Sequence, residues 1–164
     1  MKILKEILIY MLIILSIILI RTYLITPVRV NGSSMNPTLV DKELLILSKI
    51  SKNIKRFDII VLNYDNDRLV KRVIGLPGDH VKYVNNLLYV NEELVLEPFL
   101  DTTTDDFDIT ALGHDIIPDD YYFVLGDNRN ASHDSRIMGL VNEEDIIGKT
   151  LFRFYPFNKI GKIK

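Results

Sequence analysis

The N-terminal stretch over residues 7–25 is almost entirely Ile, Leu, Met and Tyr, and it limits what this chain can fold into more than any other feature. About 20 helical residues cross the hydrocarbon core of a bilayer, so the stretch predicts a transmembrane helix over residues 7–25. Arg21 is expected at the outer interface, where its aliphatic stem lets the guanidinium reach the headgroups. Because Lys2 and Lys5 precede the helix, the positive-inside rule places residues 1–6 in the cytoplasm.

A cleavable signal peptide is the alternative interpretation of the same residues. Such a peptide has a shorter apolar core and ends in a small-x-small cleavage site. Here the apolar core is followed by Arg-Thr-Tyr-Leu-Ile-Thr-Pro, which contains no Ala-x-Ala pattern. We therefore expect an uncleaved, single-pass anchor in the cell membrane, with residues 26–164 forming one domain on the outer side.

Charge and cysteine content exclude several functional classes for this domain. The formal net charge of -2 provides no basic field for a nucleic acid partner. The chain has no cysteine, which excludes disulfides, thiolate nucleophiles and Cys-ligated zinc. The histidines His80, His114 and His133 lack the spacing of a zinc-binding helix. We therefore expect neither a metal ion nor a cofactor.

Beyond Pro27, short apolar runs separated by turn residues predict a mostly-β domain. The pair Asn85-Asn86 lies between two such runs and indicates a tight hairpin, because Asn tolerates positive φ. Two short stretches, Asn36–Val40 and Asn142–Ile147, are the only ones that we expect to be helical. The candidate strands are Glu43–Ser48, Asp58–Tyr64, Arg68–Leu76, His80–Val84, Leu87–Val90 and Tyr121–Leu125.

An acidic segment over residues 101–120 contains seven aspartates and neither Lys nor Arg. A calcium loop needs acidic residues at alternating positions, with a Gly and a distal Glu, and that spacing is absent. The segment instead predicts a solvated, mobile surface loop.

The first segment with the composition of a reactive site follows the predicted anchor. Gly32 permits backbone conformations closed to other residues, and Pro37 restricts the chain soon after. A serine held in such a bend, Ser34, can expose its Oγ while its own N–H points at a developing oxyanion. Gly-Ser-Ser turns are common, so this segment alone also fits a purely structural turn.

A lysine within a strand-like run is the second candidate. Lys71 and its neighbour Arg72 are expected to point to opposite faces of a strand. A buried lysine is rare unless it is paired or functional. Burial disfavours the charged amine, and a pKa lowered from about 10.4 to about 7–8 would make it a usable general base. Neutral Lys71 could then accept the proton of Ser34 directly, without a histidine.

A third polar run, residues 126–139, directly follows an apolar strand. Its acidic and basic side chains have the chemistry of a network that supports an active site. A solvated loop with incidental ion pairs fits this composition equally well. The charged residues concerned are Asp127, Arg129, Asp134 and Arg136.

Three motifs, in this order after an anchor, resemble those of type I signal peptidases. They are Ser-Met-x-Pro-Thr from Ser34, Lys-Arg-Val-Ile-Gly-Leu-Pro-Gly-Asp from Lys71, and Gly-Asp-Asn-Arg-x-x-Ser-x-Asp-Ser-Arg from Gly126. Shorter similar stretches begin at Arg56, Glu97 and Ile147, so the resemblance covers nearly the whole chain. Several multi-residue motifs in one order are far more specific than any single motif.

The resemblance implies a role for each matching residue. Ser34 would be the nucleophile, Lys71 the general base, and the Ser132 hydroxyl would orient the lysine amine. The Ser34 N–H would supply one oxyanion donor. Some family members add a serine hydroxyl two positions earlier, where this chain has Gly32, so the second donor is not assigned. The supporting ion pairs would come from Asp127, Arg72, Asp134 and Arg136.

The resemblance also implies a β-rich catalytic core at the outer membrane surface, acting on preproteins that carry signal peptides. Small side chains would be required at −1 and −3 of the cleaved peptide, and an acyl-enzyme would form. A self-cleaving repressor-type Ser/Lys protease would lack an anchor, which residues 7–25 provide. A catalytically dead adaptor is disfavoured because Ser34, Lys71 and Ser132 are all present. A specialised maturation peptidase with few substrates stays open.

Overall fold

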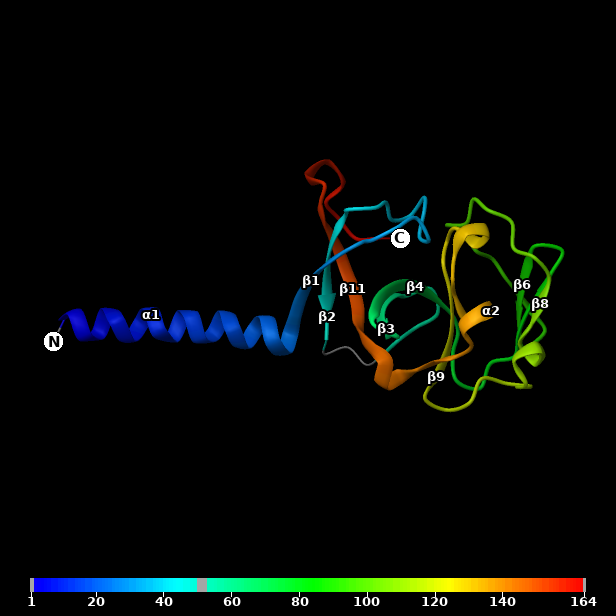
Figure 1. The fold of residues 1–164 in the computed structure, drawn as a ribbon, viewed down its shortest axis with the longest axis horizontal. Coiled ribbons are helices and arrows are strands. Elements are labelled where there is room, and N and C mark those ends of the chain that lie inside the picture. The colour runs from blue at the N-terminus through cyan, green and yellow to red at the C-terminus, as the bar shows by residue number, and fades with distance from the viewer. Residues whose placement is uncertain (1, 50–52, 164) are drawn as a thin grey trace.

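The computed structural model describes residues 2–49 and 53–163, which form a long N-terminal helix and a β-rich domain (Figure 1). Helix α1 spans Lys2–Leu19 and continues through a π-helical turn, Ile20–Leu24. None of its residues is buried, and the 23-residue segment is long and apolar enough to cross a bilayer. The helix therefore begins before the predicted span over residues 7–25.

The helix joins the main sheet without a linker. Strand β1, Ile25–Arg29, begins at the residue after the π-helical turn. Lys49, which follows β2 (Leu44–Ser48), donates from Nζ to the Thr22 carbonyl at 3.1 Å and from its backbone N–H to the Leu24 carbonyl at 3.0 Å. Because the last carbonyls of a helix have no intrahelical partner, these two bonds attach the helix end to the domain.

The main sheet contains seven strands in the order β1-β2-β11-β3-β4-β9-β10, all antiparallel. Strand β11, Ile146–Tyr155, lies between β2 and β3 and so joins the C-terminal part of the chain to the N-terminal strands. The remaining strands are β3 (Ile59–Tyr64), β4 (Asp67–Gly75), β9 (Tyr121–Leu125) and β10 (Val141–Asn142).

A second, smaller sheet has the strand order β7-β6-β5-β8 and lies on the side of β9 away from β1 (Figure 1). Its hairpin joins β5 (Val81–Val84) to β6 (Leu87–Val90) through Asn85 and Asn86, which both have positive φ, as the sequence predicts. The outer strands are β7 (Glu93–Val95) and β8 (Phe107–Asp108). The short helical elements are α2 (Ser135–Met138) and the 3-10 turns Ile109–Leu112, Arg129–Ala131, Glu143–Asp145 and Phe157–Lys159.

The long loop between β1 and β2 is held against the core by its own apolar side chains. Met35 and Leu39 are buried and pack in one cluster with Leu45 and Leu47 of β2. Burying a side chain of this size contributes about 1.5–3 kcal/mol. The residue next to them, Ser34, therefore lies on a loop whose base is part of the core.

The prediction of a mostly-β fold is confirmed, and all six predicted strands are present. Five strands were not predicted: β1, β7, β8, β10 and β11. In β1, Pro27 lowers the strand signal, but the edge position tolerates it because an edge strand needs fewer hydrogen bonds. In β11, two register shifts break the alternation of buried and exposed residues on which a sequence-based prediction depends.

Both helix predictions were wrong in extent. Asn36–Val40 forms turns with one helix-type bond, from the Leu39 N–H to the Met35 carbonyl. Within Asn142–Ile147, only Glu143–Asp145 is helical, because the chain enters β11 directly afterwards.

The acidic segment over residues 101–120 is not simply a solvated loop. It contains β8 and a 3-10 turn, and its side chains Ile109 and Ile117 are 0% and 1% exposed. These two isoleucines pack in the same core cluster as Phe123 of β9. The prediction of a mobile loop was therefore wrong: the segment is ordered and packs against the small sheet. The aspartates around the two isoleucines hid their apolar pattern in the sequence.

Replacement of Gly148 by alanine is expected to weaken the contact between β11 and β2. A Cβ at this position would collide with the backbone carbonyl of Ser48, which has no freedom to turn aside within its strand. We expect Gly148→Ala to lower the free energy of unfolding by about 1–3 kcal/mol, measured by denaturant unfolding of the full chain in detergent. Leu151→Ala, an exposed site in the same strand, is the control, and equal stability of the two variants would contradict the packing argument.

Candidate active site

Lys71 lies in β4 within a continuous run of buried residues that begins at Val70. Its side chain is 1% exposed, although lysine is among the residues least often buried. The Nζ amine donates a hydrogen bond to the Ser132 Oγ at 3.0 Å. Ser132 follows the 3-10 turn Arg129–Ala131 and is itself buried. The predicted lysine and the serine expected to orient it are therefore in direct contact.

Burial lowers the pKa of Lys71 from 10.5 to about 8. The nearby Asp134 carboxylate opposes this shift because it stabilises the charged amine, and Arg136 adds to the lowering. A pKa of about 8 leaves about one lysine in ten neutral at pH 7, against about one in 2,500 for an unperturbed lysine. The amine is thus able to accept a proton near neutral pH.

Ser34 is half-buried in the loop between β1 and β2, beside the polar run that contains Ser132. The Asn128 N–H donates to the Ser34 carbonyl at 3.0 Å, and Asn128 Nδ2 donates to the Ser33 carbonyl at 3.2 Å. Gly126 lies between the two serines, since a Cβ there would collide with both the Ser132 Oγ and the Ser34 carbonyl oxygen. The fold therefore brings Ser34, Ser132 and the lysine amine to one place.

Gly32 has a φ of 89°, a conformation that L side chains rarely adopt. This explains why glycine precedes the serine pair. Its N–H donates to the Asp41 Oδ1 at 3.0 Å, across the loop. The position two residues before Ser34 therefore contributes no hydroxyl to the site.

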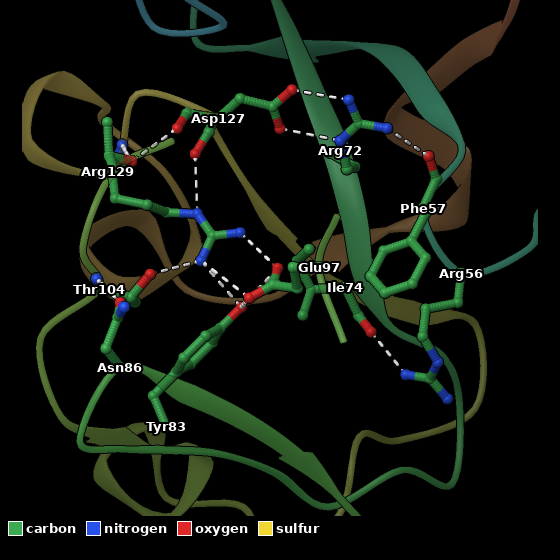
Figure 2. A network of polar contacts seen from close by, with 12 residues as sticks. Arg56, Phe57, Arg72, Ile74, Tyr83, Asn86, Glu97, Thr104, Asp127 and Arg129 are labelled. Carbon is green, nitrogen blue, oxygen red and sulfur yellow. Dashed lines mark hydrogen bonds and ion pairs between the residues drawn. The ribbon is translucent and has the colours of Figure 1, made fainter. Parts of the chain in front are cut away.

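Arg72, the neighbour of Lys71, makes a buried ion pair on the other face of β4. Its Nε and Nη2 donate to the two carboxylate oxygens of Asp127 at 2.8 and 2.7 Å, and Nη1 donates to the Phe57 carbonyl at 3.0 Å (Figure 2). The guanidinium carbon also lies 3.8 Å from the centre of the Phe99 ring. A bidentate pair of this kind fixes orientation as well as distance.

Asp134 and Arg136 form a second pair beside Lys71. Arg136 donates from Nε and Nη2 to the two Asp134 oxygens, each at 2.9 Å, and Nη2 also donates to the Arg129 carbonyl at 2.6 Å. The Gly126 N–H donates to Asp134 Oδ2 at 3.1 Å. Asp134 therefore holds the glycine that separates the two serines, and it also influences the charge of Lys71.

A third buried pair was not predicted from the sequence. The Arg129 side chain is 0% exposed and donates to Glu97 Oε1 at 2.5 Å, to the Tyr83 hydroxyl at 2.9 Å and to Thr104 Oγ1 at 2.6 Å (Figure 2). Its Nε donates to the Gly126 carbonyl at 3.1 Å. Arg129 thus connects the small sheet to Gly126, the glycine between the two serines.

The sequence contained weak signals for this third pair. Arg129 belongs to the polar run, and Glu97 begins one of the shorter stretches that resemble signal peptidases. Nothing local joins the two residues, which are separated by 32 positions. Burial raises the pKa of Tyr83, so its phenol stays protonated and is able to donate to Glu97.

The described residues contain no group of three or more His, Asp or Glu side chains able to hold a metal ion. His80 contacts the acidic segment instead, with Nδ1 2.6 Å from the Asp115 carbonyl oxygen and Nε2 3.5 Å from Asp108 Oδ2. His133 packs its ring against Tyr64 at 5.6 Å between centroids.

Known proteins share both the sequence and the fold. The sequence model of the family described as signal peptidase, peptidase S26, matches residues 2–155. A signal peptidase I of Bacillus amyloliquefaciens is 45% identical over 162 residues, which make up 90% of this chain and 85% of that protein. Signal peptidase IB of Staphylococcus aureus is 39% identical over 155 residues, 84% of this chain and 81% of that protein. The crystal structure of a signal peptidase I from Enterococcus faecalis matches with a TM-score of 0.57 at 36% identity, covering 60% of this chain and 97% of that chain.

Alanine at position 126 is expected to separate the two serines. Its Cβ would displace either the Ser132 side chain or the backbone of Ser34. We expect Gly126→Ala to reduce peptidase activity by about 100-fold or more, because a displacement of about 1 Å is sufficient for such a loss. Gly113→Ala is the control for a general loss of stability, because its Cβ meets no atom within 4 Å but its φ of 83° strains the backbone away from the site. Full activity of Gly126→Ala would show that the two serines do not need this close approach.

The lowered pKa of Lys71 predicts a pH-dependent stability. Between pH 10.5 and 8 the unfolded chain binds a proton at this lysine and the folded chain does not, so stability falls as the pH falls through this window. The loss should approach about 3 kcal/mol at pH 8 and change little below it. Denaturant unfolding at several pH values, compared with Lys71→Met, measures the effect. A wild type and a Lys71→Met variant with parallel pH dependence would contradict the buried, neutral amine.

Proposed function

Because the chain belongs to the signal peptidase family, peptidase S26, we propose that it removes N-terminal signal peptides from exported preproteins, with Ser34 as nucleophile and Lys71 as general base. The family makes it a serine endopeptidase. The observation that carries the catalytic assignment is the buried Lys71 amine, which has a lowered pKa and contacts Ser132 beside the Ser34 loop.

In the proposed reaction, neutral Lys71 accepts the proton of the Ser34 hydroxyl while Oγ attacks the scissile carbonyl. The oxyanion of the tetrahedral intermediate accepts a hydrogen bond from the Ser34 N–H. Protonated Lys71 then donates its proton to the leaving amine, and an ester to Ser34 remains. Water attacks this ester with Lys71 again as the base, which releases the signal peptide and restores the serine. Ser132 fixes the direction of the amine throughout.

A groove lined by the segments that lead to Ser34 and to Lys71 fits an extended peptide. Its volume of ≈ 560 Å³ lies within the range of about 300–1,000 Å³ that is usual for ligand sites. One wall comes from β1 and the residues leading to Ser34, and the other comes from the start of β4, leading to Lys71. β1 is the last strand of its sheet, and β4 pairs with β9 only from Arg72 onward. The lining residues are Pro27, Val28, Arg29, Asn31, Asn66, Asp67, Arg68 and Leu69.

These two strand edges support a binding mode for the substrate. An extended peptide adds to an open strand edge through main-chain hydrogen bonds, and alternate side chains enter pockets in the protein. We propose that the residues before the cleavage site bind in this groove, with small side chains at −1 and −3. Bulky side chains at those two positions would be excluded by size.

The apolar helix supports a membrane-bound enzyme. We propose that residues 7–25 span the bilayer, with residues 1–6 in the cytoplasm and the catalytic domain on the outer side, because Lys2 and Lys5 precede the span. A signal peptide is itself held in the bilayer. Tethering the enzyme in the same plane raises the effective concentration of each for the other.

Cleavage of a model preprotein tests the proposal. Membranes containing wild type, Ser34→Ala or Lys71→Ala are incubated with a preprotein bearing Ala-x-Ala, and the new N-terminus is mapped by mass spectrometry. We expect the wild type to cut after the final Ala and both variants to lose about 10³-fold or more in rate. Ser33→Ala is the matched control, because the bonds of Ser33 to other described residues are made by its backbone carbonyl and not by its hydroxyl, and it should retain activity. Cleavage by Ser34→Ala or by Lys71→Ala would refute the dyad.

A further inference from the structure

The loop that carries Ser34 is closed at its base by backbone hydrogen bonds. The Val30 N–H donates to the Glu43 carbonyl at 2.8 Å, and the Lys42 N–H donates to the Val30 carbonyl at 2.9 Å. On one side of the loop, Asn128 bonds to the carbonyls of Ser33 and Ser34. These contacts leave the other side, which includes Thr38, to be held by a different part of the chain.

Arg153 of β11 holds that other side. Its Nη2 donates to the Thr38 carbonyl at 2.6 Å, from a position 115 residues later in the sequence. Its Nε lies 2.9 Å from Glu43 Oε2 at an angle too poor for a hydrogen bond, so this contact is an ion pair. Both side chains are largely buried, at 14% and 4% exposed, which strengthens the attraction between the charges. One guanidinium therefore joins the base of the loop to its far side.

The C-terminal segment fixes Arg153 in turn. The Arg153 N–H and carbonyl pair with the Gly161 carbonyl and N–H at 2.8 and 3.2 Å, so the chain folds back onto β11. Ile163 packs against the cluster that contains Met35 and Leu39, and the C-terminus lies beside the loop between β1 and β2 (Figure 1). Ile163 thus supports the loop through the core cluster, and Gly161 supports it through Arg153.

We propose that Arg153 is a positioning residue for the nucleophile: its bonds to Thr38 and Glu43 hold the Ser34 loop at the distance that proton transfer to Lys71 requires. The inference rests on the proposed role of Ser34. Within the loop, the Leu39 N–H donates to the Met35 carbonyl at 2.8 Å. A shift at Thr38 is therefore passed to the residue next to Ser34. Arg153 touches neither the substrate groove nor Lys71 in any described contact.

The position of Arg153 leads to a defined kinetic signature. Loss of its bond to Thr38 moves the nucleophile, so kcat falls, whereas the groove that binds the peptide keeps its shape and KM is unchanged. The surroundings of Lys71 also stay the same, so the acid limb of the pH profile of kcat/KM stays near pH 8. A residue that only stabilises the fold would change none of these kinetic quantities in the folded enzyme.

The test compares the full-length enzyme in detergent with Arg153→Met, Arg153→Lys and the double variant Glu43→Gln/Arg153→Met. The double variant leaves no unpaired buried carboxylate, so it keeps the question answerable where Arg153→Met alone fails to fold. We expect kcat to fall about tenfold or more in both Met variants, with KM within about twofold of wild type. Arg153→Lys, which keeps the charge beside Glu43, should recover part of the loss. Lys159→Met is the matched control, because Lys159 is half-exposed and 3.8 Å from the same carboxylate.

Each other outcome overturns the inference. A folded double variant with kcat within about twofold of wild type would show that the Thr38 bond has no effect on the nucleophile. A loss confined to KM, a shifted acid limb, or an equal loss in Lys159→Met would place the effect elsewhere. Ser34→Ala is measured alongside: if it still cleaves, the proposed function fails, whereas its inactivity together with normal Arg153 variants overturns only the inference about Arg153.

Discussion

The burial of one lysine amine is the constraint on which the rest of the domain depends. A charged amine out of water is strongly unfavourable, so the folded chain lowers the pKa of Lys71 and supplies one hydroxyl, from Ser132, as a neutral hydrogen-bond partner. The carboxylate of Asp134 is near enough to oppose the shift, but it is already paired with Arg136. The amine is therefore excluded from water, and the nearby carboxylate is already paired with an arginine. Both conditions favour the neutral amine, which is the form that a general base requires.

Four arginines of the domain share one pattern: each is paired with a carboxylate and also donates to a backbone carbonyl. A guanidinium can do both because its donors are arranged in a rigid fork. The loop backbone is then fixed by the same group that neutralises a buried acid. The carbonyls belong to Phe57 for Arg72, Gly126 for Arg129, Arg129 for Arg136 and Thr38 for Arg153.

Local patterns predicted the parts of the fold that local chemistry controls. The hairpin at Asn85 and Asn86 follows from the φ values that asparagine tolerates, and the apolar residues on both sides of Lys71 and Arg72 are typical of a strand. Strand β11 was not predicted, although it lies inside the sheet between β2 and β3. Its register shifts depend on the pairing with these two strands and not on its own sequence. The core residues Ile109 and Ile117 were hidden among aspartates that face water.

The amino-acid sequence by itself determined the apolar helix, the mostly-β class and the motifs that contain Ser34, Lys71 and Ser132. These depend on composition, periodicity and short spacings, which are properties of neighbouring residues. Only the tertiary structure decided that Lys71 is buried against Ser132, that Arg129 pairs with Glu97, and that Arg153 reaches the Ser34 loop. Those contacts join residues far apart in the chain, and they exist only because the folded chain brings these residues together and removes water from around them.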